Sequence, residues 1–107
     1  MDIFQVSEMT GTTEFGGTVK IAVSAETPSN LSSGVFILQP GQALIPDIHN
    51  SDEIFYVASG TLTLRDGDRT EEHQVRAGNM VRIPKGIVHL SSNESSDDVV
   101  IVWTFAN

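Results

Sequence analysis

Four side chains that can bind a metal ion or move a proton stand in two short stretches of the sequence. Asp47, His49 and Glu53 lie within "PDIHNSDE", and His89 lies within "KGIVHLSS". Successive side chains of an extended strand point to opposite faces, so Asp47 and His49 are expected on one face, about 6.6 Å apart. Glu53 keeps the same parity if the chain stays extended. This spacing suits ligands of one ion, and the alternative is a polar turn after Pro46 in which a local hydrogen bond holds Asp47.

Composition limits which chemistry these residues can do and which partners the chain can have. The 107 residues contain no cysteine, which leaves histidine and carboxylate as the metal ligands. The net charge of -8 argues against binding to nucleic acid or to an anionic membrane surface. No basic leader and no long apolar run is present, so we expect a cytoplasmic protein. The length and the 39% hydrophobic content predict one domain over residues 1–107.

The elements that must position these side chains are predicted to be β-strands. Short runs rich in Val, Ile, Phe and Thr alternate with Gly, Pro, Asn, Ser and Asp, and no run shows helical spacing. The runs cover residues 18–26, 33–39, 53–64, 79–84 and 99–106. Asp66 and Gly67 separate two strand-like segments and predict a tight hairpin in which Gly67 takes a positive φ. The expected fold class is all-β, with about eight to ten short strands in a sandwich or small barrel.

The spacing of the two stretches resembles the two motifs of the cupin superfamily. The first motif has glycine, histidine, glutamate and glycine at fixed positions, which Gly41, His49, Glu53 and Gly60 match, while Asp47 stands where the family has its first histidine. All fixed positions of the second motif are present, namely Gly78, Pro84, Gly86, His89 and Asn93. Five fixed residues at background frequencies of roughly 5% each coincide by chance about once in 10⁶ starts.

The resemblance implies a cupin-type double-stranded β-helix, a jelly-roll barrel, with one divalent metal ion inside it. His49, Glu53 and His89 are its ligands by resemblance. Asp47 is inferred on chemistry alone, as an anionic oxygen donor on the same face, and the alternative is that it accepts a hydrogen bond from a ligand or a bound water. The ion is expected to be Mn, Fe, Zn or Ni.

Within the second motif, the residue types also have structural roles. Pro84 and Gly86 are expected to turn the chain so that His89 points inward. Asn93 is expected to tie the following loop to the backbone as an Asx turn.

Several functions are compatible with such a site. The first hypothesis is a metal-dependent enzyme acting on a small polar organic substrate, by isomerase, lyase, cyclase or dioxygenase chemistry. Without metal, Asp47 and Glu53 would be two close carboxylates, one of them protonated near neutrality and able to act as a general acid or base. The alternatives are a ligand-binding or sensing cupin without turnover, and a structural dimer that has lost its metal.

Apolar residues near the motifs suggest a pocket and a second subunit. The residues expected to line the pocket are Phe55, Val57, Ile83 and Trp103. Both faces of the last strand are apolar, which predicts a homodimer that covers the outer face through Ile54, Tyr56, Val100 and Val102. His73 has acidic neighbours and no motif register, and we expect it on a solvated strand face.

Overall fold

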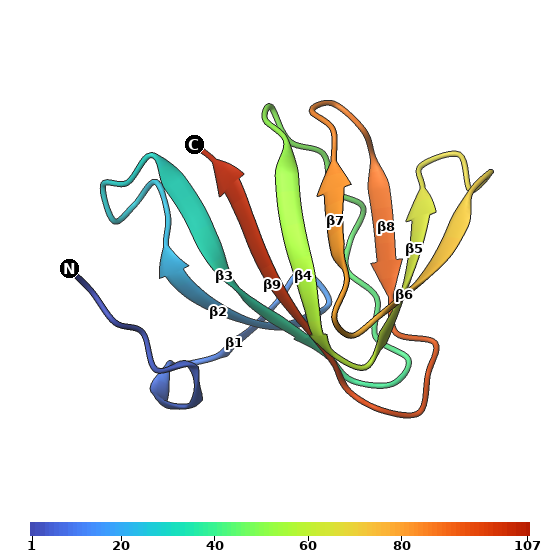
Figure 1. Ribbon diagram of the computed structural model, residues 1–107, viewed down its shortest axis with the longest axis horizontal. Coiled ribbons are helices and arrows are strands. Elements are labelled where there is room, and N and C mark those ends of the chain that lie inside the picture. Colours follow the sequence, from blue (N-terminus) through green and yellow to red (C-terminus); the bar gives the residue numbers. More distant parts are fainter.

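Nine β-strands and one short 3₁₀ helix make up the chain, all 107 residues of which are described by this computed structural model (Figure 1). The strands form a six-stranded sheet in the order β1-β2-β3-β9-β4-β7 and a three-stranded sheet in the order β6-β5-β8. All pairings are antiparallel, and the predicted all-β class is confirmed. The elements are η1 (Val6–Glu8), β1 (Thr12–Glu14), β2 (Gly17–Val23), β3 (Leu31–Leu38), β4 (Glu53–Ser59), β5 (Thr61–Asp66), β6 (Glu72–Arg76), β7 (Met80–Ile83), β8 (His89–Ser92) and β9 (Val99–Ala106).

The last strand organises the larger sheet. β9 covers the run predicted at residues 99–106 and pairs with β3 on one side and β4 on the other. Val99, Ile101 and Trp103 are buried, while Val102 on the alternate face is 39% exposed. The inner residues belong to a core of ten buried side chains contributed by both sheets: Val19, Leu38, Phe55, Val57, Leu62, Leu64, Ile83, Val99, Ile101 and Trp103.

One predicted strand is two strands in the structure. The run at 53–64 breaks at Gly60, where β4 of the large sheet ends and β5 of the small sheet begins. Gly60 has φ of 80°, and a Cβ atom there would collide with the carbonyl oxygen of Asp98. Only glycine tolerates both conditions, so this residue is the point at which the chain crosses between sheets.

The hairpin after β5 is present, but its turn differs from the predicted one. The loop spans residues 67–71, and Arg69 rather than Gly67 has the positive φ, at 58°. The Asp66 carboxylate holds the loop by accepting hydrogen bonds from the Thr70 hydroxyl and the Glu71 N–H. Gly67 instead packs closely against Val88, since a Cβ atom added there would lie 3.0 Å from Cβ of Val88.

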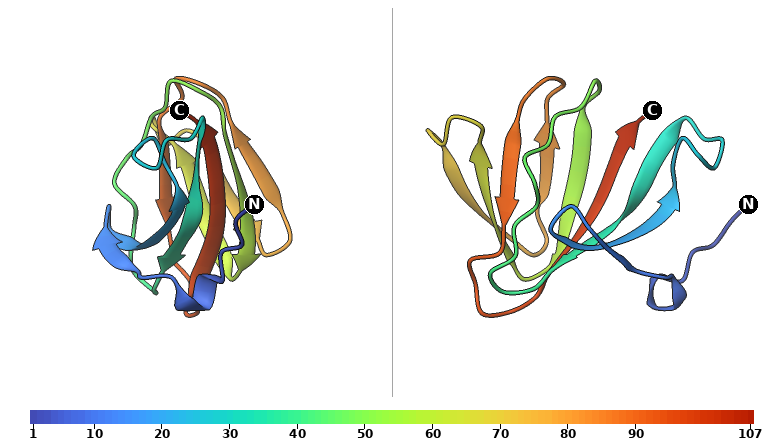
Figure 2. Two further views of the ribbon diagram at one scale, coloured as in Figure 1. Left: turned by 90° about the vertical axis from the view of Figure 1, so that its left-hand side faces the viewer. Right: turned by 180° about the vertical axis from the view of Figure 1, so that it is seen from behind.

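The segment between β3 and β4 carries the first motif and runs beside β8 without forming a continuous strand (Figure 2). It touches β8 through isolated bridges, Ala43 with Ser92 and Asp47 with His89. Asp47 and His89 exchange two backbone hydrogen bonds, of 3.2 and 3.1 Å. The two motifs are therefore joined through the main chain at the residues that were expected to bind metal.

The second motif adds two further anchors. Gly86 has φ of 78° and donates its N–H to the carbonyl oxygen of His49 at 3.0 Å, which confirms the predicted sharp turn. Asn93 is fully buried, and its side-chain oxygen accepts a hydrogen bond from the Ser95 N–H, which confirms the Asx turn. No helix of the structure has the length and hydropathy needed to cross a membrane.

Candidate metal centre

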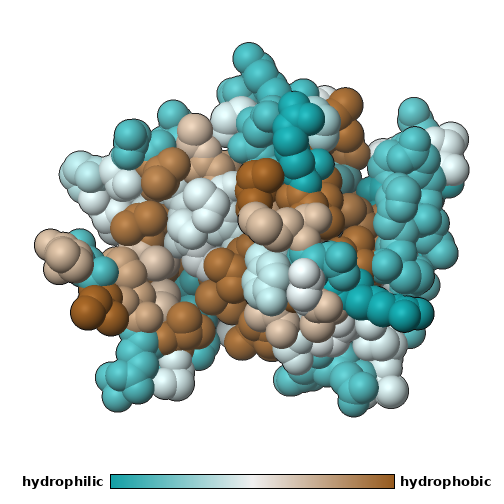
Figure 3. Space-filling view, in the orientation of Figure 1, coloured by the Kyte–Doolittle hydropathy of each residue, from teal (hydrophilic) through white to brown (hydrophobic).

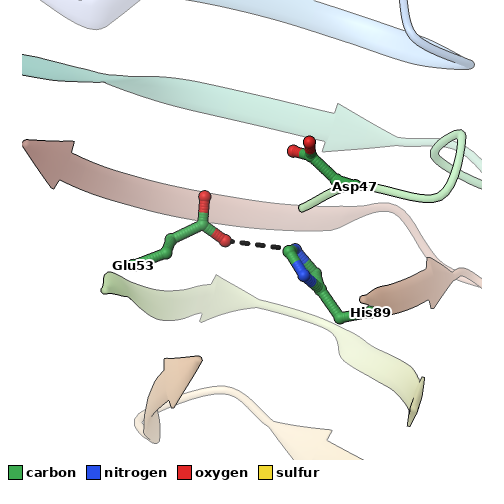
Figure 4. Close-up of side chains that lie close together, drawn as sticks. All are labelled: Asp47, Glu53 and His89. Carbon is green, nitrogen blue, oxygen red and sulfur yellow. Dashed lines mark ion pairs between the residues drawn. The ribbon is translucent and has the colours of Figure 1, made fainter. Parts of the chain in front are cut away.

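Asp47, Glu53 and His89 converge inside the fold from three different elements (Figure 4). Asp47 lies on the segment before β4, Glu53 opens β4 and His89 opens β8. One ligand atom from each of the three lies within 4.8 Å of the other two. Ligand bonds of about 2.0–2.2 Å allow donor atoms of one ion to lie at most about 4.4 Å apart, so small side-chain movements from this spacing would let a single divalent ion bind.

The Glu53 carboxylate lies between the two histidines. Glu53 and His89 are each 7% exposed, and Oε1 of Glu53 lies 3.3 Å from Nε2 of His89. Its other oxygen, Oε2, lies 3.2 Å from Nε2 of His49. A buried carboxylate needs compensating partners, and Glu53 has an imidazole at each oxygen.

His49 joins the group through the carboxylates. Its Nε2 lies 2.9 Å from Oδ2 of Asp47 and 3.2 Å from Glu53, while its ring centroid stays 6.2 Å from that of His89. Neither carboxylate contact has hydrogen-bond geometry, so Nε2 of His49 is buried without a hydrogen-bond partner. Buried polar atoms almost always have a partner. An ion held by the same carboxylates would give this nitrogen one.

Charge around His89 favours its protonated form in the absence of metal. Burial lowers the pKa of His89, but hydrogen bonding to Glu53 and the negative charges of Glu53 and Asp47 outweigh it, and the net pKa lies above the usual histidine value. Metal ions bind neutral imidazole. A cation at the centre would therefore replace the proton that the two carboxylates otherwise attract.

Two cavities adjoin these side chains. The smaller has a volume of about 30 Å³ and is bordered by Asp47, Glu53 and His89. That volume exceeds what a single water needs. The larger has a volume of about 310 Å³ and reaches Asp47, His49 and Glu53 from the side of β2 and β3. The donors and the enclosed space together fit a bound ion with an adjoining ligand pocket.

Of the residues expected to line a pocket, Trp103 borders both cavities and Phe55 borders the smaller. Val57 and Ile83 line neither cavity and belong to the buried core instead. The pocket residues expected from the sequence did not include Phe105, Phe15 or Phe36. These three residues line the larger cavity. Parity along β9 places Phe105 on the same face as Trp103, whereas nothing local to Phe15 indicates its position. His73 is exposed on β6, as expected.

The profile of the cupin domain family matches residues 34–105, which include every residue of the centre. An uncharacterized protein of Streptomyces coelicolor is 33% identical over 73 residues, which are 68% of this chain and 68% of that protein. The chain belongs to the cupin family.

Solved structures give the same fold. The polyketide cyclase RemF from Streptomyces resistomycificus superposes with a TM-score of 0.84 at 17% identity, covering 99% of this chain and 79% of RemF. Oxalate oxidase in complex with glycolate superposes with a TM-score of 0.80 at 24% identity, covering 99% of this chain and 59% of that one. The predicted cupin jelly roll is confirmed, and identities this low carry no reaction across.

Proposed function

We propose that this cupin binds one divalent metal ion through Asp47, His49, Glu53 and His89 and is an enzyme acting on a small molecule in the adjoining cavity. One observation carries the proposal: Nε2 of His49 is buried between two carboxylates without a hydrogen bond. Asp47 does accept a local hydrogen bond, from the N–H of Ile48 at 2.9 Å, but a polar turn alone does not account for the His49 nitrogen. That two proteins of the same fold are named as a cyclase and an oxidase supports the assignment to an enzyme.

The carboxylates set the charge of the centre. A divalent ion with Asp47, Glu53 and two neutral histidines would have a net charge near zero, against about +1 with three histidines and one glutamate. When bound, the ion would supply Lewis-acid or redox chemistry. The second carboxylate would make the ion a weaker Lewis acid. Glu53 contacts both imidazoles and orients them. The Asp47 side chain is 50% exposed, and it is the carboxylate placed to exchange a proton with a ligand.

Elemental analysis of protein purified under metal-replete conditions tests the site. We expect about one Mn, Fe, Zn or Ni ion per chain, near-complete loss in His89→Ala, and a loss of at least tenfold in affinity in Asp47→Ala. His73→Ala is the matched control, because His73 is an exposed histidine paired only with Glu71, and its occupancy should equal wild type. Circular dichroism must show that each variant is folded. Wild-type protein without metal would contradict the proposal, and full affinity in Asp47→Ala would remove Asp47 from the ligand set.

We also propose that two copies associate through the outer face of the large sheet. Tyr56 pairs with Val102 on one side and Met80 on the other, and Ile54 lies on the same face of β4. These four side chains are 40, 39, 67 and 39% exposed in the same order. Figure 3 shows hydrophobic residues gathered across the middle of the molecule in the orientation of Figure 1. A single apolar patch crossing neighbouring strands can pair with its own copy about a two-fold axis.

Light scattering at micromolar concentration measures this association. We expect the mass of a dimer for wild type and of a monomer for Val102→Lys, because the lysine would place a charge within the patch. Ile87→Lys puts the same charge at another exposed apolar residue and should leave the dimer intact. A monomeric wild type would refute the association.

A further inference from the structure

The larger cavity beside the metal centre has a polar end and mostly hydrophobic walls. Its volume is about 310 Å³, which lies at the lower end of the range for small-molecule sites. Its polar end consists of Asp47, His49 and Glu53. Most of the remaining lining is hydrophobic: Phe15, Val19, Ile21, Phe36, Leu44, Ile45, Trp103 and Phe105, with Ser24 and Ser32.

Aromatic rings form a continuous row along this lining. The ring of His49 stacks on Phe105 with centroids 4.2 Å apart, and Phe105 stacks on Trp103 at 5.4 Å. Trp103 contacts Phe36 at 5.9 Å, and Phe36 meets Phe15 edge to face at 6.4 Å. The row leads from the metal centre to the rim of the cavity. Flat rings gain most from such a wall, because stacked and edge-to-face contacts add to simple burial.

The charges of the cavity disfavour an acidic ligand. No lysine or arginine lines either cavity, and the charged side chains are the carboxylates of Asp47 and Glu53. A divalent ion would bring this end only to neutrality. An anionic ligand would then bury its charge among apolar residues without a cation to pair with it, which is costly.

Phe15 occupies a backbone conformation that phenylalanine rarely adopts. It forms the two-residue turn between β1 and β2 together with Gly16, and the two residues have φ of 56° and 96°. Turns with two positive φ values strongly favour Asn-Gly or Gly-Gly. The turn is fixed against the first motif, because Ile45 donates its N–H to the carbonyl oxygen of Phe15 at 2.9 Å. A strained, half-exposed phenylalanine at the rim of a cavity indicates a role in binding.

We propose that this cavity takes a flat, uncharged aromatic molecule carrying a carbonyl or hydroxyl oxygen, held between Phe15 at the rim and the aromatic row beside the metal centre. The inference rests on the proposed function, because the cavity is taken as the site for the small molecule. The oxygen is inferred from two observations. The donors of the centre lie at one end of the cavity, and Trp103, one of the lining residues, has a buried indole N–H without an acceptor in the protein.

A matched pair of probes tests the ligand class. 2-Acetylnaphthalene and 2-naphthoate share one ring system and differ in a neutral methyl ketone against a carboxylate. Trp103 is the single tryptophan of the chain, so quenching of its fluorescence reports occupancy directly. We expect the ketone to quench Trp103 of the Zn²⁺-loaded protein with a Kd at least tenfold below that of the naphthoate. Equal or tighter binding of the naphthoate, or of oxalate, would overturn the proposal.

Phe15→Asn tests the role of the turn. Asparagine is favoured at this turn position, so the variant should keep the wild-type unfolding midpoint or raise it. The Kd for 2-acetylnaphthalene should nevertheless rise about tenfold, because one aromatic contact is lost. A residue with a purely structural role would lose stability and binding together. Unchanged affinity in this variant would refute the role of Phe15.

Zinc content measured on the same samples separates this inference from the proposed function. Bound zinc with no quenching by the ketone would overturn the ligand class and leave the metal centre standing. Quenching by the ketone in protein that takes up no zinc would support the ligand class and overturn the metal centre.

Discussion

Asn93 is the one polar residue among the largest fully buried side chains of the protein, and its removal should cost a large part of the domain's stability. Asn93 is fully buried, and its amide group donates to the carbonyl oxygens of Leu38 at 2.8 Å and Asp97 at 2.7 Å. Its oxygen accepts hydrogen bonds from the N–H and the hydroxyl of Ser95. The residue therefore ties the end of β3 to the loop that precedes β9.

The free-energy cost of Asn93→Ala depends on whether each group that bonded to Asn93 can find a new hydrogen-bond partner. Leu38 is fully buried, and its carbonyl oxygen loses this donor, which costs about 1–3 kcal/mol. Ser95 and Asp97 lie at the surface, where water replaces the lost bonds, at about 0.5–1.5 kcal/mol each. The sum is about 2–6 kcal/mol, against about 5–15 kcal/mol for the stability of a typical domain. We expect the unfolding midpoint to fall by at least about 8 °C.

Chemical unfolding in urea, followed by circular dichroism, measures this cost. Asn79→Ala is the matched control, because the Asn79 side chain is exposed and makes a single hydrogen bond, to the carbonyl oxygen of Arg76. It should cost less than about 1 kcal/mol. Asn93→Asp keeps the shape but removes both donors, so it should cost at least as much as Asn93→Ala. A free energy of unfolding for Asn93→Ala within 1 kcal/mol of wild type would refute the reasoning.

Two further substitutions test the backbone and the surface charges. Gly16→Ala should destabilise the fold by more than about 2 kcal/mol in urea unfolding, because φ is +96° and the new Cβ would strike the carbonyl oxygen of Ala43; a stable variant would contradict this. The pKa of Asp52 is held below its usual value, chiefly by the N–H of Lys85, so its contribution is present above about pH 4 and is lost as pH falls further. Asp52→Asn should therefore lower the free energy of unfolding at pH 7 and have less effect at pH 3. The control Asp68→Asn should have little effect at either pH. An equal effect of Asp52→Asn at both pH values would show that the charge of Asp52 does not stabilise the fold.

The predicted runs cover β2, β3, β4, β5, β7 and β9, whose patterns depend on residues close together in the chain, whereas β1, β6 and β8 lie outside them. The bounds of β9 follow from its unbroken apolar run, and the turn at Gly86 follows from the Pro-x-Gly of the second motif. The predictions that went wrong depend on contacts between distant segments. Gly67 packs closely against Val88, a contact between distant segments that "LRDGDR" alone does not reveal.

For the candidate site too, features that depend on spacing along the chain were predicted, and features that depend on tertiary pairing were mostly missed. Spacing brought Asp47, His49, Glu53 and His89 to attention because the motif positions are fixed along the chain. Of the phenylalanine and tryptophan side chains in the aromatic row, Trp103 alone was predicted to line the pocket, because the row is assembled from β3, β9 and the β1–β2 turn, and the register of those strands is set by tertiary pairing. Phe15 lies in a turn, where residue alternation gives no information about which side chain faces the cavity.

The backbone hydrogen bonds between Asp47 and His89 form a frame for the site that does not depend on the side chains expected to bind the ion. Their carbonyl and N–H groups hold the two positions together whatever side chain stands at 47. A histidine at that position, as elsewhere in the family, would leave the frame intact and change only the ion's charge environment. Aspartate and histidine codons differ by a single base. Members of this fold can therefore change between the more Lewis-acidic centre with histidine at this position and the less acidic centre with aspartate, while the backbone frame stays folded.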